Sequence, residues 1–232
     1  MAAQASPDAK NADELATALW SGAHGIPTRL LLLRHGQTPL SVERRYSGRG
    51  EPALTTLGER QALGAARRLS AMDSIDATTP ILSSPLGRTR QTAQAVADAT
   101  GGSVEINDGL IETDFGAWEG LTFAEAAERD PELHRRWLSD SSVPPPGGES
   151  FDAVHRRVLK FRDDLFAAYG GRTVVVVSHV TPIKTLLRIG LDAGPALLYR
   201  LHLDLASLSM VDFYPDGNAS VRLVNDISHH PH

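Results

Sequence analysis

Cysteine is absent from this sequence of 232 residues. Its absence excludes a thiol nucleophile, a disulfide framework and a thiolate metal site. Also missing is any apolar run that approaches the length of a membrane span, and the first residues lack the charged and apolar regions of a signal peptide. We therefore expect a cytoplasmic protein without a membrane partner.

Positive charge is not in excess either, since the formal net charge is −5 at pH 7. An acidic chain offers no broad basic surface, so we expect no nucleic-acid partner for this domain. A small cationic pocket within it would still suit a small anionic ligand. The 41% hydrophobic and 22% charged fractions are ordinary for a globular protein, and the length suffices for one large domain or two small ones.

Two short apolar runs each end close to a histidine. Leu30–Leu33 is followed by Arg34 and His35, and Val174–Val177 is followed by a serine and His179. Such runs are typical of buried parallel strands, and ligands bind beyond the carboxyl ends of these strands. We therefore expect both histidines at one edge of a sheet, where the adjacent arginine completes a compact cationic pocket.

Composition divides the chain into three parts. Residues 1–27 are rich in alanine and small polar residues, and we interpret them as a flexible N-terminal lead-in or a linker. Residues 28–228 form one expected domain. Residues 229–232, which include three histidines, are interpreted as a solvated C-terminal tail.

Strand-like and helix-like segments alternate through the expected domain, which predicts an α/β fold. We expect a three-layer sandwich with a mostly parallel central sheet, helices on both faces and antiparallel additions at its end. Strands are predicted at residues 29–33, 81–83, 104–106, 173–177 and within 201–224. Capping residues and prolines predict helix starts at Thr56, at Ser84 with Pro85, at Thr122, at Ser150, and at Thr181 with Pro182.

Two further residues complete a candidate phosphoryl-transfer site. Arg88 lies in the first turn of a predicted helix, where free backbone amides favour an anion, and Glu112 lies in a loop. Two arginines bind phosphoryl oxygens well, and a neutral histidine can attack phosphorus. A second, protonated histidine would stabilise the transferring group, and a carboxylic acid would protonate the leaving alkoxide. This scheme needs no metal and no cofactor.

Each of these residues carries little weight alone. A lone histidine after a strand is more often structural, and Glu112 is not distinguished by itself from Asp114, Glu119 or Glu125. The ordered set of motifs carries the argument. These motifs are Arg34-His35-Gly36-Gln37-Thr38, Ser84-Pro85-Leu86-Gly87-Arg88, Glu112 before Phe115-Gly116-Ala117-Trp118-Glu119-Gly120, and Ser178-His179.

In this order the motifs resemble the histidine phosphatase superfamily, in the branch that contains the cofactor-dependent phosphoglycerate mutases. The resemblance covers about residues 29–226. It implies a phosphoglycerate mutase-like fold with His35 as the nucleophile and Glu112 as the proton donor, and Arg34, Arg88 and His179 as the rest of the catalytic set. We expect activity to be highest on the acid side of neutrality, because the donor must carry a proton.

More narrowly, the chain is similar to the α-ribazole phosphatase-like group. It most resembles the C-terminal half of actinobacterial proteins that join a ribonuclease H domain to an acid phosphatase. The resemblance implies a metal-independent acid phosphatase that acts through a phosphohistidine on a small phosphorylated metabolite. α-Ribazole phosphate, and with it cobalamin biosynthesis, is one such substrate. Fusion to an N-terminal ribonuclease H domain and a homodimer through the sheet edge are also implied.

The resemblance also marks a substrate rim. Two positions depart from the family's usual residues: Ser41 replaces an asparagine and Val180 replaces a glycine. Ser47 and Gly48 match a pair of backbone contacts to substrate. Arg44, Arg45 and Arg49 flank that pair and form either a mobile basic rim or a solvated loop. An aromatic base could stack on Tyr46, Trp118 or Phe123.

Two alternatives share these residues. A phosphoglycerate mutase would have a longer segment between the proton donor and the second histidine. Here the segment of residues 120–150 is short and holds one adjacent arginine pair, Arg135 and Arg136. A non-catalytic module that binds a phosphorylated metabolite would usually have lost the nucleophile or an arginine, and none is lost here. A phosphatase is therefore favoured.

Overall fold

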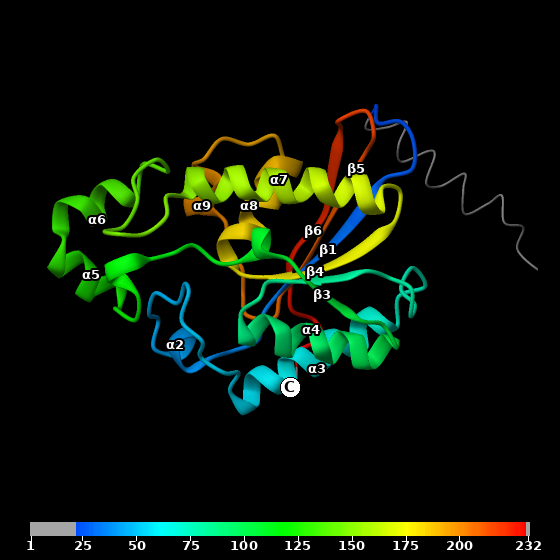
Figure 1. The fold of residues 1–232 in the computed structure, drawn as a ribbon, viewed down its shortest axis with the longest axis horizontal. Coiled ribbons are helices and arrows are strands. Elements are labelled where there is room, and N and C mark those ends of the chain that lie inside the picture. Colours follow the sequence, from blue (N-terminus) through cyan, green and yellow to red (C-terminus); the bar gives the residue numbers. More distant parts are fainter. Residues whose placement is uncertain (1–21, 231–232) are drawn as a thin grey trace, which may run out of the picture.

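A six-stranded sheet forms the centre of this computed structural model, which describes residues 22–230 (Figure 1). The strand order is β3-β2-β4-β1-β5-β6. Strands β3, β2, β4 and β1 pair in parallel, while β5 and β6 pair antiparallel at one end. The strands are β1 (Thr28–Arg34), β2 (Ile81–Ser83), β3 (Val104–Ile106), β4 (Thr173–Ser178), β5 (Leu208–Phe213) and β6 (Ala219–Asp226).

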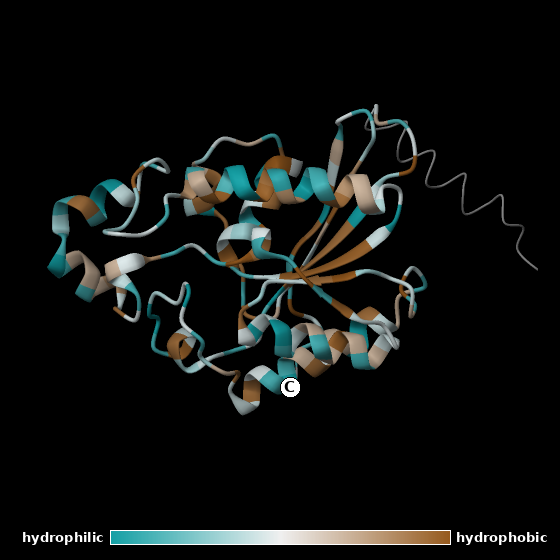
Figure 2. Cartoon of the chain, in the orientation of Figure 1, coloured by the Kyte–Doolittle hydropathy of each residue, from teal (hydrophilic) through white to brown (hydrophobic). Residues whose placement is uncertain are grey.

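Helices cover both faces of this sheet, as the sequence predicts (Figure 1). Leu31 and Leu33 of β1 pack with α3 (Thr56–Ser70) and α4 (Gly87–Thr100), whereas Leu30 and Leu32 pack with α7 (Phe151–Tyr169) and α8 (Val180–Gly190). Successive side chains of a strand point to opposite faces, so a continuous apolar run fits a strand that is buried on both sides. Figure 2 shows the central strands as the most hydrophobic part of the chain.

The shorter elements gather beyond the carboxyl ends of the parallel strands. Residues of α2 (Pro39–Val42) follow β1, and an isolated antiparallel bridge joins Arg45 to Thr122, at the start of α5. The others are α5 (Phe123–Arg129), α6 (Pro131–Trp137), α9 (Leu197–Arg200) and the short 3-10 helices η1 (Asp108–Leu110) and η2 (Gly116–Trp118). Within residues 22–230, no helix is long and apolar enough to cross a membrane.

Three predicted helix caps are displaced by one or two residues. Thr55, not Thr56, caps α3 by accepting a hydrogen bond from the Gly58 amide at 3.0 Å. Helix α4 begins at Gly87, after Ser84 and Pro85, and α8 begins at Val180, before Thr181. Pro182 still fits the first turn of α8, because the first amides of a helix have no intrahelical partner. The caps at Thr122 and Ser150 are confirmed.

Two predictions at the C-terminal end also need correction. Residues 201–207 are not strand, because β5 begins only at Leu208. His229 is half-buried rather than solvated, since its Nε2 lies 2.8 Å from the Ala206 carbonyl and its own carbonyl packs against Gly64 of α3. Residues 1–21 and 231–232, which hold most of the predicted lead-in and half of the predicted tail, lie outside the described residues.

An aromatic cluster supports the region beyond the strand ends. Trp118 is fully buried, and its indole N–H donates to the Asp130 carboxylate at 2.7 Å. Tyr46 is buried as well, with its hydroxyl 2.8 Å from Nε2 of His134. Neither ring can stack on a substrate, which corrects the expectation from the sequence. Of the three aromatic candidates only Phe123 is exposed, at 56%.

Replacing Trp118 by alanine should therefore destabilise the protein. We expect Trp118→Ala to lower the free energy of unfolding by about 3–5 kcal/mol, because a large cavity opens and Asp130 loses a hydrogen bond. The exposed Phe123 is a matched control, and Phe123→Ala should cost about 1 kcal/mol. Urea unfolding, monitored by far-UV circular dichroism rather than by tryptophan fluorescence, measures both free energies. Equal losses would mean that Trp118 is not part of a packed core.

Candidate active site

His35 and His179 lie side by side at the carboxyl edge of the sheet. They follow the paired strands β1 and β4, whose last residues Arg34 and Ser178 are in register. The His35 amide donates to the Ser178 carbonyl at 3.1 Å, and the two imidazole centroids are 5.1 Å apart. Both histidines are buried. The parallel register thus brings together two residues that are far apart in the sequence.

The tautomer of His35 follows from one hydrogen bond. Its Nδ1 lies 2.8 Å from the Gly36 carbonyl, which can only accept, so Nδ1 carries the proton and Nε2 carries the lone pair. Burial holds the pKa of His35 well below its ordinary value of 6.5, and the charges of Arg34 and Arg88 lower it further. His35 is therefore a neutral imidazole with a free Nε2 at pH 7.

His179 is oriented by the hydroxyl of Ser84. Its Nε2 lies 2.8 Å from Ser84 Oγ, whereas its buried Nδ1 has no hydrogen-bond partner among residues 22–230. Burial lowers the pKa of His179 well below 6.5, and the charge of Arg88 lowers it further. Without a bound anion this environment favours a neutral His179, because a charged imidazole would be buried beside two arginines. The expectation of a protonated second histidine in the transition state stays a prediction.

Arg34 projects from the end of β1 into the same region. One of its terminal nitrogens donates to the Leu203 carbonyl at 2.6 Å, and its buried Nε has no partner in the part of the chain that the structure describes. Burial lowers its pKa to about 10, while the carboxylates of Glu112 and Asp204 act in the opposite direction. The guanidinium is still fully charged at pH 7.

Arg88 lies in the first turn of α4 with its side chain completely buried. Its guanidinium donates to the carbonyls of Gly50 at 2.8 Å, Gly48 at 2.8 Å and Ser47 at 3.2 Å. Its buried Nε has no partner within the described residues. Arg88 therefore binds residues 47–50 through their main chain and still presents one free donor.

Glu112 is held under the N-terminus of α8. Its carboxylate accepts from the Thr113 amide at 2.8 Å and from the Thr181 amide at 3.3 and 3.4 Å. Its charge acts on Arg34, Arg88 and Lys184, which donates to the Leu198 carbonyl at 2.7 Å. Glu112 is thus the buried carboxylate that both arginines face.

The other carboxylates left open by the sequence have structural partners. Asp114 accepts from the Gly116 amide within its own loop. Glu125 closes the capping box of α5 and pairs with Arg45. Glu119 accepts from the amides of residues 48 and 50. Glu112 differs from these three because it is buried and its charge acts on both Arg34 and Arg88.

An ion pair that the sequence does not reveal supports the loop of Glu112. Arg157 of α7 forms a two-pronged pair with Glu149 at 2.9 and 3.0 Å. It also donates to the carbonyls of Gly109 at 2.9 Å and of Glu112 at 3.2 Å. The two partners are far from Glu112 in sequence and carry no motif, so only the fold shows the link.

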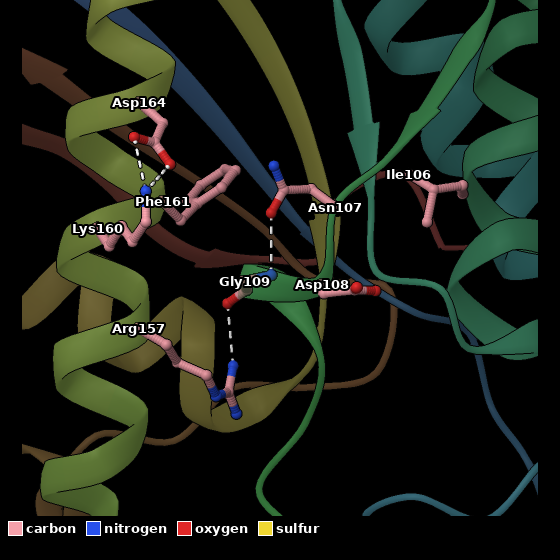
Figure 3. Close-up of a pocket in the computed structure, with 8 residues that line it drawn as sticks. All are labelled: Ile106, Asn107, Asp108, Gly109, Arg157, Lys160, Phe161 and Asp164. Carbon is pink, nitrogen blue, oxygen red and sulfur yellow. Dashed lines mark hydrogen bonds and ion pairs between the residues drawn. The ribbon is translucent and has the colours of Figure 1, made fainter.

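A cavity of about 430 Å³ lies between α7 and residues 106–109 (Figure 3). Arg157 lines it, but neither histidine does. Lys160, which also lines the cavity, is paired with Asp164 at 2.7 Å, so its positive charge is already neutralised. The candidate active site is therefore the buried histidine and arginine cluster and not this cavity.

Comparisons with known proteins identify the family of this chain. A family model described as the histidine phosphatase superfamily, branch 1, matches residues 30–226. The chain belongs to this branch of the superfamily. The resemblance inferred from the motifs is thus confirmed, and relatives that the chain matches carry the names of phosphatases or of phosphoglycerate mutases.

Three relatives show how the likeness is distributed. The bifunctional protein Rv2228c of Mycobacterium tuberculosis is 64% identical over 206 residues, which cover 89% of this chain and 56% of that protein. The chain thus spans about half the length of this relative. Phosphoserine phosphatase 1 of Hydrogenobacter thermophilus is 34% identical over 196 residues, 84% of this chain and 91% of the relative. The α-ribazole phosphatase structure from Shigella flexneri matches with a TM-score of 0.76 and 28% identity, over 86% of this chain and 97% of that one.

The residues that the family resemblance places at the substrate rim have varied surroundings. Ser41 closes a capping box with Thr38, to whose carbonyl its hydroxyl donates at 2.7 Å. Arg45 pairs with Glu43 and Glu125 and donates to the Gly120 carbonyl, so it is neither solvated nor free. Val180 is the first residue of α8 and is partly exposed.

Ser47 and Gly48 lie beside Arg88, as the preceding contacts show. The Ser47 hydroxyl is buried without a partner among the described residues, and the Gly48 amide is already donated to Glu119. Across residues 22–230, no group of three or more histidines and carboxylates is placed to hold a metal ion. Arg34 and Arg88 are positive charges that act on His35.

The two buried histidines should make the stability of the protein depend on pH. Their pKa values are lowered in the folded state, so below pH 6.5 the unfolded chain binds more protons and the free energy of unfolding falls as pH falls. His35→Asn and His179→Asn should each reduce the loss between pH 7.5 and 5.5 by about 1 kcal/mol. Urea unfolding at both pH values measures this. His202→Asn, at a side chain that is 79% exposed, should leave the loss unchanged, and the same loss in all four proteins would contradict the assignment.

Proposed function

We propose that this protein is a metal-independent phosphomonoesterase that acts through a phosphohistidine at His35. The observation that carries the proposal is a set of buried donors without partners in the described chain: Nε of Arg34, Nε of Arg88 and Nδ1 of His179. Buried polar groups are rarely left unsatisfied. A phosphoryl group has several oxygens and would accept from all three beside the free Nε2 of His35.

In the first step, Nε2 of His35 forms a bond to phosphorus as the bond between phosphorus and the alcohol oxygen breaks. Glu112, in its protonated form, gives its proton to the departing alkoxide. In the second step, a water molecule attacks phosphorus, the nitrogen–phosphorus bond breaks, and Glu112 takes a proton from the water. Arg34 and Arg88 stabilise the charge on the equatorial oxygens in both steps.

His179 contributes a hydrogen bond without needing a positive charge. Ser84 Oγ accepts from the Leu86 amide at 3.4 Å and lies 2.8 Å from Nε2 of His179, to which we propose that it donates its own proton. An imidazole that accepts at Nε2 carries its proton at Nδ1. Nδ1 is the partnerless atom, so a neutral His179 donates to a phosphoryl oxygen. A bound dianion would then favour full protonation of this ring.

Hydrolysis is favoured over a mutase reaction by the segment between Glu112 and His179. Residues 120–150 form only α5, α6 and a proline loop. Arg135 is 71% exposed at its side chain and pairs with Glu132, and Arg136 is also exposed. This arginine pair does not contribute to the buried site. A purely binding role is disfavoured because the nucleophile, both arginines and the acid are all present.

We propose a small phosphorylated metabolite as the substrate. The α-ribazole phosphatase from Shigella flexneri makes α-ribazole phosphate one candidate, which would place the protein in cobalamin biosynthesis. Phosphoserine and other monoesters are further candidates from the names of relatives. The exposed Phe123 is the remaining aromatic ring of the three that could contact a base. A panel of phosphorylated metabolites, ranked by kcat/KM, discriminates among these substrates.

A longer protein is part of the same proposal. Because the match covers only 56% of the mycobacterial relative, which is named bifunctional, we propose that this region supplies the acid phosphatase activity of such a protein. The ribonuclease H activity implied by the family resemblance would belong to an N-terminal domain. A cytoplasmic location and a homodimer through a sheet edge stay predictions.

His35→Ala should reduce phosphatase activity at least about 10³-fold, because the nucleophile is lost. Brief exposure of the wild-type protein to a ³²P-labelled substrate, followed by a denaturing quench, should leave an acid-labile and base-stable label on the chain. His35→Ala should carry no such label, whereas the exposed control His202→Ala should be labelled like the wild type. Undiminished labelling of His35→Ala would refute the proposal.

Glu112→Gln should slow substrates in proportion to how much their leaving group needs a proton. Hydrolysis of an alkyl phosphate should fall about 10²–10⁴-fold, since an alkoxide must be protonated as it departs. A nitrophenyl phosphate should fall less than about tenfold, because the phenolate leaves unaided. Steady-state kcat/KM values for both esters test this. Equal losses would show that Glu112 holds the loop rather than supplies the proton.

A further inference from the structure

The main chain of residues 47–50 is hydrogen-bonded on one side to the Arg88 guanidinium and on the other to the Glu119 carboxylate. Arg88 donates to the carbonyls of Ser47, Gly48 and Gly50, as described above. Glu119, which follows η2, accepts from the Gly48 amide at 2.9 Å and from the Gly50 amide at 3.0 Å. The main chain of this segment is therefore clamped between a guanidinium and a carboxylate.

The two amides converge on a single carboxylate, which is how main-chain amides bind anions in proteins. Glu119 is a partly buried internal anion that fills this place. A Cβ atom built on Gly48 or on Gly50 would lie 2.9 Å from its carboxylate oxygens, so the approach depends on the absence of side chains at both positions. The pair of amides is thus a small anion site that the chain itself occupies.

This filled anion site adjoins the reacting groups. The charge of Glu119 acts on Arg88, whose pKa it raises against the effect of burial. On its other side, Gly48 packs so closely against the Thr113 carbonyl that a Cβ there would collide with it. Gly48 therefore lies between Arg88 and the residue next to Glu112. The clamp is therefore adjacent to Arg88, which would contact the phosphoryl group, and to the loop of Glu112, which would protonate the leaving group.

We propose that Glu119 is a specificity-determining residue that discriminates against leaving groups with a carboxylate, which removes phosphoserine from the candidate substrates. This inference rests on the proposed phosphatase function. A carboxylate on the leaving group is repelled by the negative charge of Glu119. It cannot bind the amides of residues 48 and 50, because both already donate to Glu119. A neutral hydroxyl or sugar at the same place meets no such repulsion, so the site selects phosphate esters of neutral alcohols.

Two substrates that differ only in this group test the proposal. Glycerol 3-phosphate carries a hydroxymethyl group where 3-phosphoglycerate carries a carboxylate. The wild-type enzyme should favour glycerol 3-phosphate in kcat/KM. Glu119→Ala frees both amides and should raise the ratio of 3-phosphoglycerate to glycerol 3-phosphate at least about tenfold. Glu119→Gln keeps an accepting oxygen, preserves the segment and should raise the ratio by a smaller factor through loss of charge alone.

Glu51 provides a matched control. It is exposed, its charge also acts on Arg88, and it accepts from the Gly87 amide at 2.7 Å rather than from residues 48 and 50. Glu51→Gln removes the same charge from the same neighbourhood and should change the substrate ratio less than about twofold. A ratio that is unchanged in both Glu119 variants, or that changes as much in Glu51→Gln, overturns the proposal.

A binding experiment separates this proposal from the phosphatase function. Titration calorimetry of 3-phosphoglycerate and glycerol 3-phosphate into His35→Ala, and into His35→Ala combined with Glu119→Gln or Glu119→Ala, needs no turnover. The affinity ratio should shift toward 3-phosphoglycerate in both double variants. If the wild-type protein hydrolyses no ester but this shift occurs, the phosphatase function fails and the role of Glu119 stands. If hydrolysis occurs and the affinity ratio does not shift, the role of Glu119 fails alone.

Discussion

The site depends on the burial of two imidazoles and two guanidinium groups at one edge of the sheet. Taking cations out of water is costly, and like charges raise the cost. The imidazoles can remain neutral under this constraint, while the guanidinium groups cannot lose their protons at ordinary pH. The neutral histidines, the partnerless nitrogens and the nearby buried Glu112 all follow from it. In the proposed function, a phosphoryl anion would accept from the partnerless nitrogens and add negative charge to that of Glu112.

The core architecture could be predicted because its signals are local. The leucine and valine runs are apolar on every residue, which is what a strand covered on both faces requires, and the helix from Phe151 shows its buried stripe at spacings of three and four. Arg34, His35 and His179 were predictable for the same reason, since each is adjacent to such a strand. Antiparallel strands at the C-terminal end of the domain were also predicted, although the first of them, β5, begins later than predicted.

The features that were missed depend on contacts between distant parts of the chain. Ser84 has the right side chain to cap a helix, but its hydroxyl is used by His179 of the neighbouring strand end. Trp118 beside a glycine-rich loop resembles a substrate contact until α5 and α6 are seen to bury it. The bond from Arg157 to the Glu112 carbonyl spans 45 residues, and no spacing in the sequence signals it. Sequence patterns identify which face is buried but not which polar partners meet.

The clamp on residues 47–50 has a consequence for how this rim can evolve. Arg88 and Glu119 contact only main-chain atoms there, so the clamp does not depend on the side chains of Ser47 or Arg49. A substitution at the exposed Arg49 therefore leaves these contacts to Arg88 in place. Gly48 and Gly50 are the exceptions, because any side chain would displace the carboxylate. A rim of alternating constrained and free positions lets a lineage explore new leaving groups while its chemistry is preserved.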